Sequence, residues 1–318
     1  MLSLPPFQDP TLAFDATTQK YIIAGTDDKL VYFSSSALTG PYLRNGSILS
    51  QAPKIDNPGR VNPWAPDLHC VDGKYYAYYT VSVAGTQISA IGVAVSESGE
   101  PGTFEDYGAL FNSSSYVSYN ALDPNLVPGH GYLSYGSYFG GIYLVRLNNL
   151  LSVDESDLPG IRIAGGYPDG DPVEGSYIYR KGGYYYLFVS NGQCCGFDQS
   201  KLPKPDTTEY KILVGRSPSL TGPYYDRSGM LMTRGGGTLV LSSFRDIYAP
   251  GGQSVFQDPK TKRYVMVFHF SNPKHANSYA SLGMYYLDFS TGWPVVRNTY
   301  SRRNAYNTST FEGPGHYS

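Results

Sequence analysis

The chain has 318 residues, with 24 basic and 26 acidic side chains and a formal net charge of −2. Like charges do not cluster, which argues against nucleic acid or an anionic membrane surface as a partner. No apolar run approaches the ~20 residues of a membrane-spanning helix. Aromatic residues make up 15% of the chain, including 31 Tyr, and are joined by 36 Gly and 23 Pro. This composition is typical of strands connected by tight turns.

Short segments of alternating apolar residues recur along the whole chain, separated by Gly, Pro, Asn or Asp. None has the periodicity of an amphipathic helix of three turns. We therefore predict an all-β protein. In chain order, the clearest predicted strands are Tyr21–Ala24, Leu30–Phe33, Lys74–Thr80, Ala90–Val95, Gly131–Tyr135, Ile142–Arg146, Ser176–Tyr179, Tyr184–Val189, Tyr210–Gly215, Gln253–Phe256, Tyr264–Phe270 and Met284–Phe289.

The strands fall into similar groups. The segment SSALTGPY at 35–42 is echoed by SPSLTGPY at 217–224, and each follows a strand. The group starts are also alike: FQDP at 7, WAPD at 64, LDP at 122, VEG at 173 and YAPG at 248. Five repeats of roughly fifty to seventy-five residues, each with about four strands, indicate a five-bladed β-propeller. A pair of β-sandwich domains is the alternative, but no linker divides the chain, and we predict a single domain over 1–318.

Three of the five group starts carry a carboxyl group directly before Pro or Gly: Asp9, Asp123 and Glu174. In a propeller the first strand of each blade lines the central channel, so these side chains should converge. Cleavage of an acetal uses two carboxyl groups, and a third can raise the pKa of the acid. Asp-Pro is also a common turn pair. The functional interpretation therefore depends on the three residues sharing one position in the repeat.

At these residues the sequence resembles the family-43 glycoside hydrolases, and the arabinanases among them. FQDP at 7–10, NALDP at 120–124 and VEGS at 173–176 are similar to the family's three acidic motifs. The resemblance spans residues 7 to about 295. It implies an inverting mechanism in which Asp9 is the general base, Glu174 the general acid, and Asp123 a residue that tunes the acid and orients the substrate.

Two further segments resemble parts of the arabinanase sugar site. They are NPWAPD at 62–67 and LSYGSYFGGI at 133–142. We expect Trp64, Tyr138 and Phe139 to pack against sugar rings. Gln8 stands where arabinanases usually have His, and we expect it close to the bound sugar. Asp67, beside Pro66, could be a fourth carboxyl group at the channel, but a structural role is favoured.

The resemblance also bears on cofactors. The segment YAPGGQ at 248–253 stands where the family commonly shows Gly-Pro-Gly-His-Asn, whose His helps to hold an ion in the central channel. Gln253 takes the place of that His, so we predict that no cofactor is required. The His residues of the chain lack the spacing of a zinc site.

The three cysteines do not form a disulfide framework. Cys194 and Cys195 resemble a Cys-Cys pair found in many arabinanases, and they could form a vicinal disulfide lining the site or remain thiols. Sequons at Asn45, Asn112 and Asn307 favour a secreted protein. No signal peptide is recognisable, so we expect one to have been removed.

These features predict a monomeric enzyme that cleaves the α-1,5-arabinan of plant cell walls. The first alternative is the same fold acting as an exo-arabinofuranosidase, a β-xylosidase or a galactanase. The second is a non-catalytic propeller that binds carbohydrate.

Overall fold

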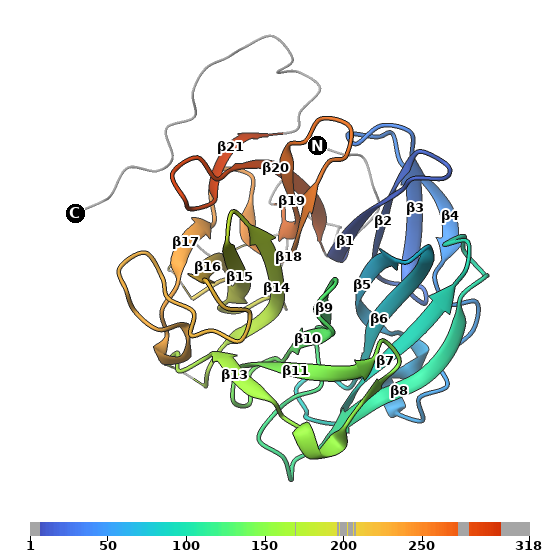
Figure 1. Ribbon diagram of the computed structural model, residues 1–318, viewed down its shortest axis with the longest axis horizontal. Helices are drawn as coiled ribbons and strands as arrows, with labels where there is room; N and C mark the ends of the chain where they lie inside the picture. The colour runs from blue at the N-terminus through green and yellow to red at the C-terminus, as the bar shows by residue number, and fades with distance from the viewer. Residues whose placement is uncertain are drawn as a thin grey trace.

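The computed structural model describes residues 7–299, except 169, 196, 198–201, 203–205, 207 and 273–279. Five antiparallel sheets surround a central axis (Figure 1), so the predicted five-bladed propeller is confirmed. Residues 300–318 lie outside the described part, and the single domain over 1–318 stays a prediction. No helix of the described part is both long and apolar enough to cross a membrane.

Each sheet is one blade and is built from strands that follow one another in the chain. Blade 1 contains β1 (Gln8–Asp15), β2 (Lys20–Thr26), β3 (Val31–Ser35) and β4 (Leu43–Ser47). Blade 2 contains β5 (Trp64–Val71), β6 (Lys74–Ser82), β7 (Ser89–Ser96) and β8 (Glu105–Ser113). Blade 3 contains β9 (Asn125–Val127), β10 (Tyr132–Tyr135), β11 (Ile142–Asn149), β12 (Ser152–Val153) and β13 (Ile161–Ala164).

The last two blades have the same design. Blade 4 contains β14 (Val173–Lys181), β15 (Tyr184–Asn191), β16 (Lys211–Ser217) and β17 (Thr238–Leu241). Blade 5 contains β18 (Tyr248–Gln257), β19 (Tyr264–Ser271), β20 (Ser281–Asp288) and β21 (Val295–Thr299). The only helical pieces of the described residues are the 3₁₀ turns η1 (Pro58–Val61), η2 (Glu155–Asp157) and η3 (Met232–Arg234).

Every strand predicted from the sequence overlaps an observed strand. Most of the missed strands lie at the outer edge of a blade. The sequence of β4 is LRNGS, and its first three residues are exposed, so no apolar alternation marks it.

The hydrophobic core is divided among the spaces between neighbouring blades. One cluster joins blades 1 and 2 through Ile22, Leu68 and Tyr79, and another joins blades 5 and 1 through Phe7 and Val267. Similar clusters fill the other three junctions. Both faces of each sheet are therefore buried, and the ring closes without long exposed edges.

The innermost strands share an irregularity close to their start. The register of β1 against β2 shifts between Gln8 and Thr11, and β5, β14 and β18 show equivalent shifts. One residue of each of these β-bulges, or of the turn before β9, has a left-handed backbone; these residues are Asp9 (φ 49°), Ala65 (46°), Asp123 (53°), Gly175 (58°) and Gly252 (56°). A β-bulge changes the direction in which the side chains of a strand point. In this protein the bulges lie beside the central channel.

Side chains of the preceding blade hold most of these bulges in place. In each case the backbone N–H of the bulge residue donates to a side chain on the second strand of that blade. The bonds are Ala65 to Thr26 Oγ1 (2.8 Å), Asp123 to Thr80 Oγ1 (3.0 Å), Gly252 to Ser190 Oγ (2.9 Å) and Asp9 to His269 Nδ1 (3.1 Å). The last of these bonds links blade 5 to blade 1 and closes the ring.

Candidate active site

A cavity opens at the channel, and the innermost strands of all five blades contribute to it. Asp9, Ala65, Asp123, Gly175 and Gly252 all line it. The structure thus brings two of the predicted carboxyl groups, those of Asp9 and Asp123, to one opening. The third belongs to Glu174, which directly precedes the cavity-lining residue Gly175.

The predicted alignment of the three acidic residues was wrong by one position. Glu174 lies opposite Ser190 in the same way that Gln8 lies opposite Thr26. Glu174 is therefore equivalent to Gln8, and the residue equivalent to Asp9 and Asp123 is Gly175. In a regular strand this offset would turn Glu174 to the other face of the sheet. The bulge interrupts that alternation, so Glu174 still reaches the site.

Asp9 is held at both its backbone and its carboxyl group. Thr26 Oγ1 donates to Asp9 Oδ2 over 2.7 Å, and His269 Nδ1 lies 3.4 Å from Oδ1. Burial raises the pKa of Asp9, but its hydrogen bonds and charge interaction with His269, together with the Thr26 bond, lower the pKa below its ordinary value. Asp9 is thus favoured as a carboxylate, the form that can accept a proton.

Asp123 has the opposite electrostatic character. Its environment raises its pKa well above the ordinary value, chiefly through burial and then through the negative charges of Glu174 and Asp9. The N–H of Gly175 donates to Asp123 Oδ2 over 3.0 Å and opposes this shift only in part.

Glu174 is bound by two hydroxyl groups. Ser137 Oγ donates to Glu174 Oε2 over 2.5 Å, and the Tyr210 hydroxyl donates to Oε1. Burial raises the pKa of Glu174; these two hydrogen bonds oppose the rise, and the negative charge of Asp9 adds to it. The net direction is upwards, so Glu174 is favoured as a protonated acid over a wider pH range than an exposed glutamate.

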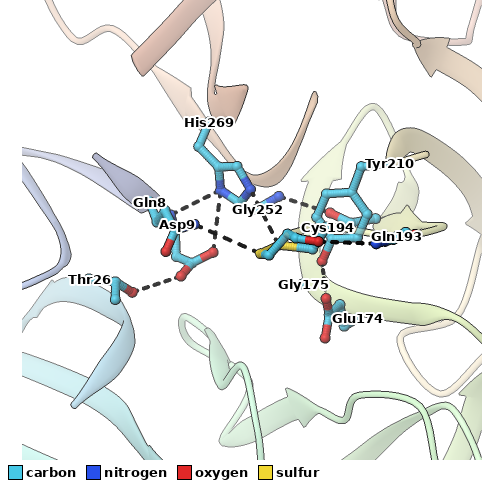
Figure 2. Close-up of a disulfide and its surroundings, with 12 residues drawn as sticks. Gln8, Asp9, Thr26, Glu174, Gly175, Gln193, Cys194, Tyr210, Gly252 and His269 are labelled. Atoms are coloured by element: carbon cyan, nitrogen blue, oxygen red, sulfur yellow. Dashed lines mark hydrogen bonds and ion pairs between the residues drawn. A yellow bond between two sulfur atoms is a disulfide. The ribbon is translucent and has the colours of Figure 1, made fainter. Parts of the chain in front are cut away.

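His269 and Tyr210 connect the surroundings of Asp9 and Glu174. Their rings stack with centroids 5.9 Å apart and an interplanar angle of 28°. Figure 2 shows His269 pointing toward Asp9 on one side and toward the Cys194–Cys195 disulfide on the other. Of the two possibilities for the cysteine pair, the structure therefore has the vicinal disulfide, and it lies at the site.

Gln8 and Tyr138 also lie at the site. Gln8 Nε2 is 3.8 Å from Cys195 Sγ, which places this side chain against the disulfide. Tyr138 has a left-handed backbone (φ 50°), and its N–H bonds to Val173 O beside Glu174. Burial and the negative charge of Glu174 raise the pKa of the Tyr138 hydroxyl.

Trp64 and Phe139 lie farther out. Trp64 starts β5 directly before Ala65 and is half-buried. Phe139 follows Tyr138 in the β10–β11 connection, and 43% of its surface is exposed. An exposed aromatic face of this kind is available for packing against a sugar ring.

Asp67 lines the cavity but is occupied by structural bonds. Its Oδ2 accepts from the Leu126 N–H over 2.7 Å, and Asn125 and His69 also contact its carboxyl group. Leu126 and Asn125 belong to the next blade. Asp67 therefore joins blade 2 to blade 3, in agreement with the structural role favoured from the sequence.

The hydrogen bonds of Gln253 show whether this side chain is available to bind an ion in the channel. Its Oε1 accepts from Ser190 Oγ over 2.8 Å, and its Nε2 donates to Gly175 O over 2.6 Å. Both ends of the amide are thus used by protein groups. In the described part of the chain, no three His, Cys, Asp or Glu side chains are grouped to hold a metal. The Gln253 amide is therefore not free to replace the ion-binding His that the resemblance implies.

Sequence reasoning missed His269, Tyr210 and Ser137. One signal was available for His269: the second strands of blades 1, 2 and 4 carry Thr26, Thr80 and Ser190 at the position that His269 occupies in blade 5. An alignment of the second strands would have shown an imidazole where three blades have a hydroxyl.

Comparison with known proteins extends these findings. Residues 6–294 match glycosyl hydrolases family 43. Arabinan endo-1,5-alpha-L-arabinosidase A of Aspergillus aculeatus is 42% identical over 293 residues, which cover 91% of this chain and 90% of that protein. The protein of the same name from Aspergillus niger is also 42% identical, over 294 residues and the same shares of the two chains.

Solved structures agree with the sequence relatives. An exo-1,5-alpha-L-arabinanase from a bovine ruminal metagenomic library has a TM-score of 0.81 and 28% identity, covering 93% of this chain and 98% of that one. A Cellvibrio cellulosa alpha-L-arabinanase complexed with arabinohexaose has a TM-score of 0.78 and 27% identity, covering 92% and 95%. Because the family match spans most of the chain, and the relatives are 42% identical over nine-tenths of it, this protein belongs to glycosyl hydrolases family 43 and is an inverting glycoside hydrolase.

Proposed function

We propose that this glycoside hydrolase cleaves α-1,5-linked arabinan, and that it does so within the chain. The observation that carries the acid–base chemistry is the contrast between Asp9, whose pKa is lowered, and the neighbouring Glu174 and Asp123, whose pKa values are raised. Carboxyl groups with separated pKa values can supply a base and an acid at the same pH. The identity with two proteins named arabinan endo-1,5-alpha-L-arabinosidase supports the substrate and the internal cleavage.

In the proposed reaction Asp9 removes a proton from a water molecule while the oxygen of that water attacks the anomeric carbon. The bond between that carbon and the departing oxygen breaks, and Glu174 donates its proton to this oxygen. One water is consumed, and the new hemiacetal has the inverted configuration. Asp9 then releases its proton to solvent, and Glu174 takes one up.

Asp123 acts on the acid in this scheme. Its carboxyl group and that of Glu174 repel each other when both are ionised, so one proton is retained by the pair to higher pH. Trp64, Tyr138, Phe139 and Gln8 are the side chains proposed to contact the sugars. No step uses an ion.

The test is an assay of purified protein on linear α-1,5-arabinan, xylan and galactan. We expect reducing ends from arabinan alone, with a rapid fall in viscosity that marks internal cleavage. Release of arabinose without loss of viscosity would indicate exo action, and products from xylan or galactan would change the substrate. Binding without products would indicate a carbohydrate-binding propeller.

Secretion is part of the proposal. A disulfide is stable in oxidising compartments, and Cys194 and Cys195 form one. Asn45 and Asn112 are exposed, so both sequons are accessible to glycosylation, whereas Asn307 lies outside the described residues. Expression in a eukaryotic host followed by glycosidase treatment would reveal attached glycans by a change in mass.

A further inference from the structure

His269 differs from the other side chains that hold the bulges. Thr26, Thr80 and Ser190 accept a bulge N–H through a hydroxyl oxygen, whereas His269 accepts one through an imidazole nitrogen. The N–H that it accepts belongs to Asp9. The exception therefore falls at the residue proposed as the general base.

The hydrogen bonds assign the tautomer of His269. A backbone N–H can only donate, so Nδ1 must present its lone pair to the amide of Asp9, 3.1 Å away. The ring proton of the neutral imidazole is then on Nε2. Cys194 Sγ lies 3.9 Å from Nε2 and can act as a weak acceptor. In the cationic form of His269, whose hydrogen bond and charge lower the pKa of Asp9, a proton on Nδ1 instead faces Asp9 Oδ1 and the bond to the backbone is given up.

The imidazole has little room to turn. It is 3% exposed and stacks on Tyr210. On another side, a Cβ atom at Gly252 would lie 2.5 Å from Nδ1 and 2.7 Å from Asp9 Oδ1, so only glycine leaves space for this contact. Figure 2 shows the ring between Asp9, Gly252 and the disulfide.

We propose that His269 is the positioning residue of Asp9, and that the Cys194–Cys195 disulfide holds the imidazole in the tautomer that this role needs. Asp9 has a left-handed backbone, a conformation that residues with a side chain seldom adopt without support. His269 fixes the backbone of Asp9, and Thr26 fixes one carboxyl oxygen. Together they leave the carboxylate one orientation toward the water that it would activate.

This inference rests on the proposed role of Asp9, so the first experiment does not depend on activity. Protein labelled with ¹⁵N at histidine is studied by NMR, and the His269 signals are identified by their loss in His269→Thr. We expect the Nε2–H tautomer in the oxidised protein. After reduction with dithiothreitol, which converts the disulfide to two thiols, we expect the Nδ1–H tautomer to appear. An Nδ1–H tautomer in the oxidised protein, or no response to reduction, would overturn the proposal even if arabinan is not the substrate.

The second experiment compares kinetics on arabinan. His269→Phe removes the acceptor, and we expect kcat to fall about 10²-fold with KM changed by less than about twofold, as for a misplaced catalytic group. His269→Thr supplies the hydroxyl used at other blade junctions and should recover at least about tenfold of that loss. His130→Phe, at a histidine on the β9–β10 turn, is the matched control for the ring.

The disulfide is tested in the same assay. Cys194→Ser should lower kcat about tenfold, whereas Cys70→Ser, at the free and exposed cysteine of the described residues, should leave it unchanged. If His269→Phe kept wild-type kcat, or if His269→Thr were as inactive as His269→Phe, the positioning role would be wrong. An inactive wild type would contradict only the proposed function, because the tautomer experiment would still decide the state of His269.

Discussion

The backbone N–H of Gly175 donates a 3.0 Å hydrogen bond to Oδ2 of Asp123. Because Gly175 directly follows Glu174, this bond connects the carboxyl group of Asp123 to the segment of blade 4 that carries Glu174. Both residues are half-buried, and desolvation is the largest cause of the raised pKa of each, so water screens their mutual repulsion less than it would at the surface. A change in the charge of one should therefore change the titration of the other.

Replacing Asp123 by Asn tests this relationship. The acid must be protonated to act, so the rate falls as the pH rises through the pKa of Glu174. That pKa is raised, which places the alkaline limb above the range of an ordinary glutamate. The two carboxyl groups repel each other when both are ionised, so the pair retains one proton to higher pH. Asn at position 123 removes this repulsion, and we expect the limb of kcat/KM against pH to move to lower pH. An unmoved limb would show that Asp123 does not tune the acid.

Glu174→Ala should separate substrates by their leaving groups. A sugar alkoxide needs a proton to depart, whereas a nitrophenolate does not. We expect a loss of about 10²–10⁴-fold on arabinan, but a much smaller loss on an activated aryl arabinoside that the wild type accepts. The alkaline limb should also flatten, since it reports the pKa of the acid. Equal losses on both substrates would assign Glu174 to binding or folding and make Asp123 the better candidate, because Asp67 is committed to bonds with blade 3.

Asp9→Asn should fold normally, because its amide oxygen can still accept the Thr26 hydrogen bond. An amide cannot take a proton from water, so we expect kcat to fall at least about 10²–10⁴-fold. In the wild type, the base must be ionised, and its lowered pKa should keep the enzyme active to a lower pH than an ordinary aspartate would allow. Turnover near that of the wild type by a folded Asp9→Asn protein would remove Asp9 from the mechanism.

Chelators should leave activity largely intact, because both ends of the Gln253 amide already bond to Ser190 and Gly175. The measurement is the rate on arabinan after dialysis against EDTA, with and without added calcium or zinc. Loss of activity that an added metal restores would contradict the assignment at Gln253.

Asp67 should matter for stability and not for proton transfer. Asp67→Ala leaves the buried N–H of Leu126 without its acceptor, which costs about 1–3 kcal/mol of unfolding free energy. Asp67→Asn keeps an oxygen at that place and should lose less. Urea denaturation measures both. A fall in kcat of Asp67→Asn as large as that of Asp9→Asn would instead place Asp67 in the catalytic mechanism.

The fold could be predicted because the second and third strands of every blade were recognisable in the sequence and the motifs at the blade starts recur. Asp9 and Asp123 could be found for the same reason, since each precedes Pro at the same point of the repeat. Glu174 was aligned with Asp9 and Asp123, but that position of blade 4 belongs to Gly175, which has no side chain, and Glu174 lies one residue earlier. His269 lies 260 residues from Asp9 in the chain, and only closure of the ring brings them together. No local pattern records that contact.

The bulge in blade 2 has a consequence for how such enzymes could change. Ala65 has the left-handed backbone of Asp9 and Asp123, faces the same cavity, and its N–H is already bound by Thr26. An aspartate introduced there would need no rearrangement of the main chain. If the blades arose by duplication, every blade would have inherited one residue with this backbone conformation at the cavity. A single substitution at such a residue, in a blade that supplies no catalytic side chain, could then introduce a new functional group without a change in the fold.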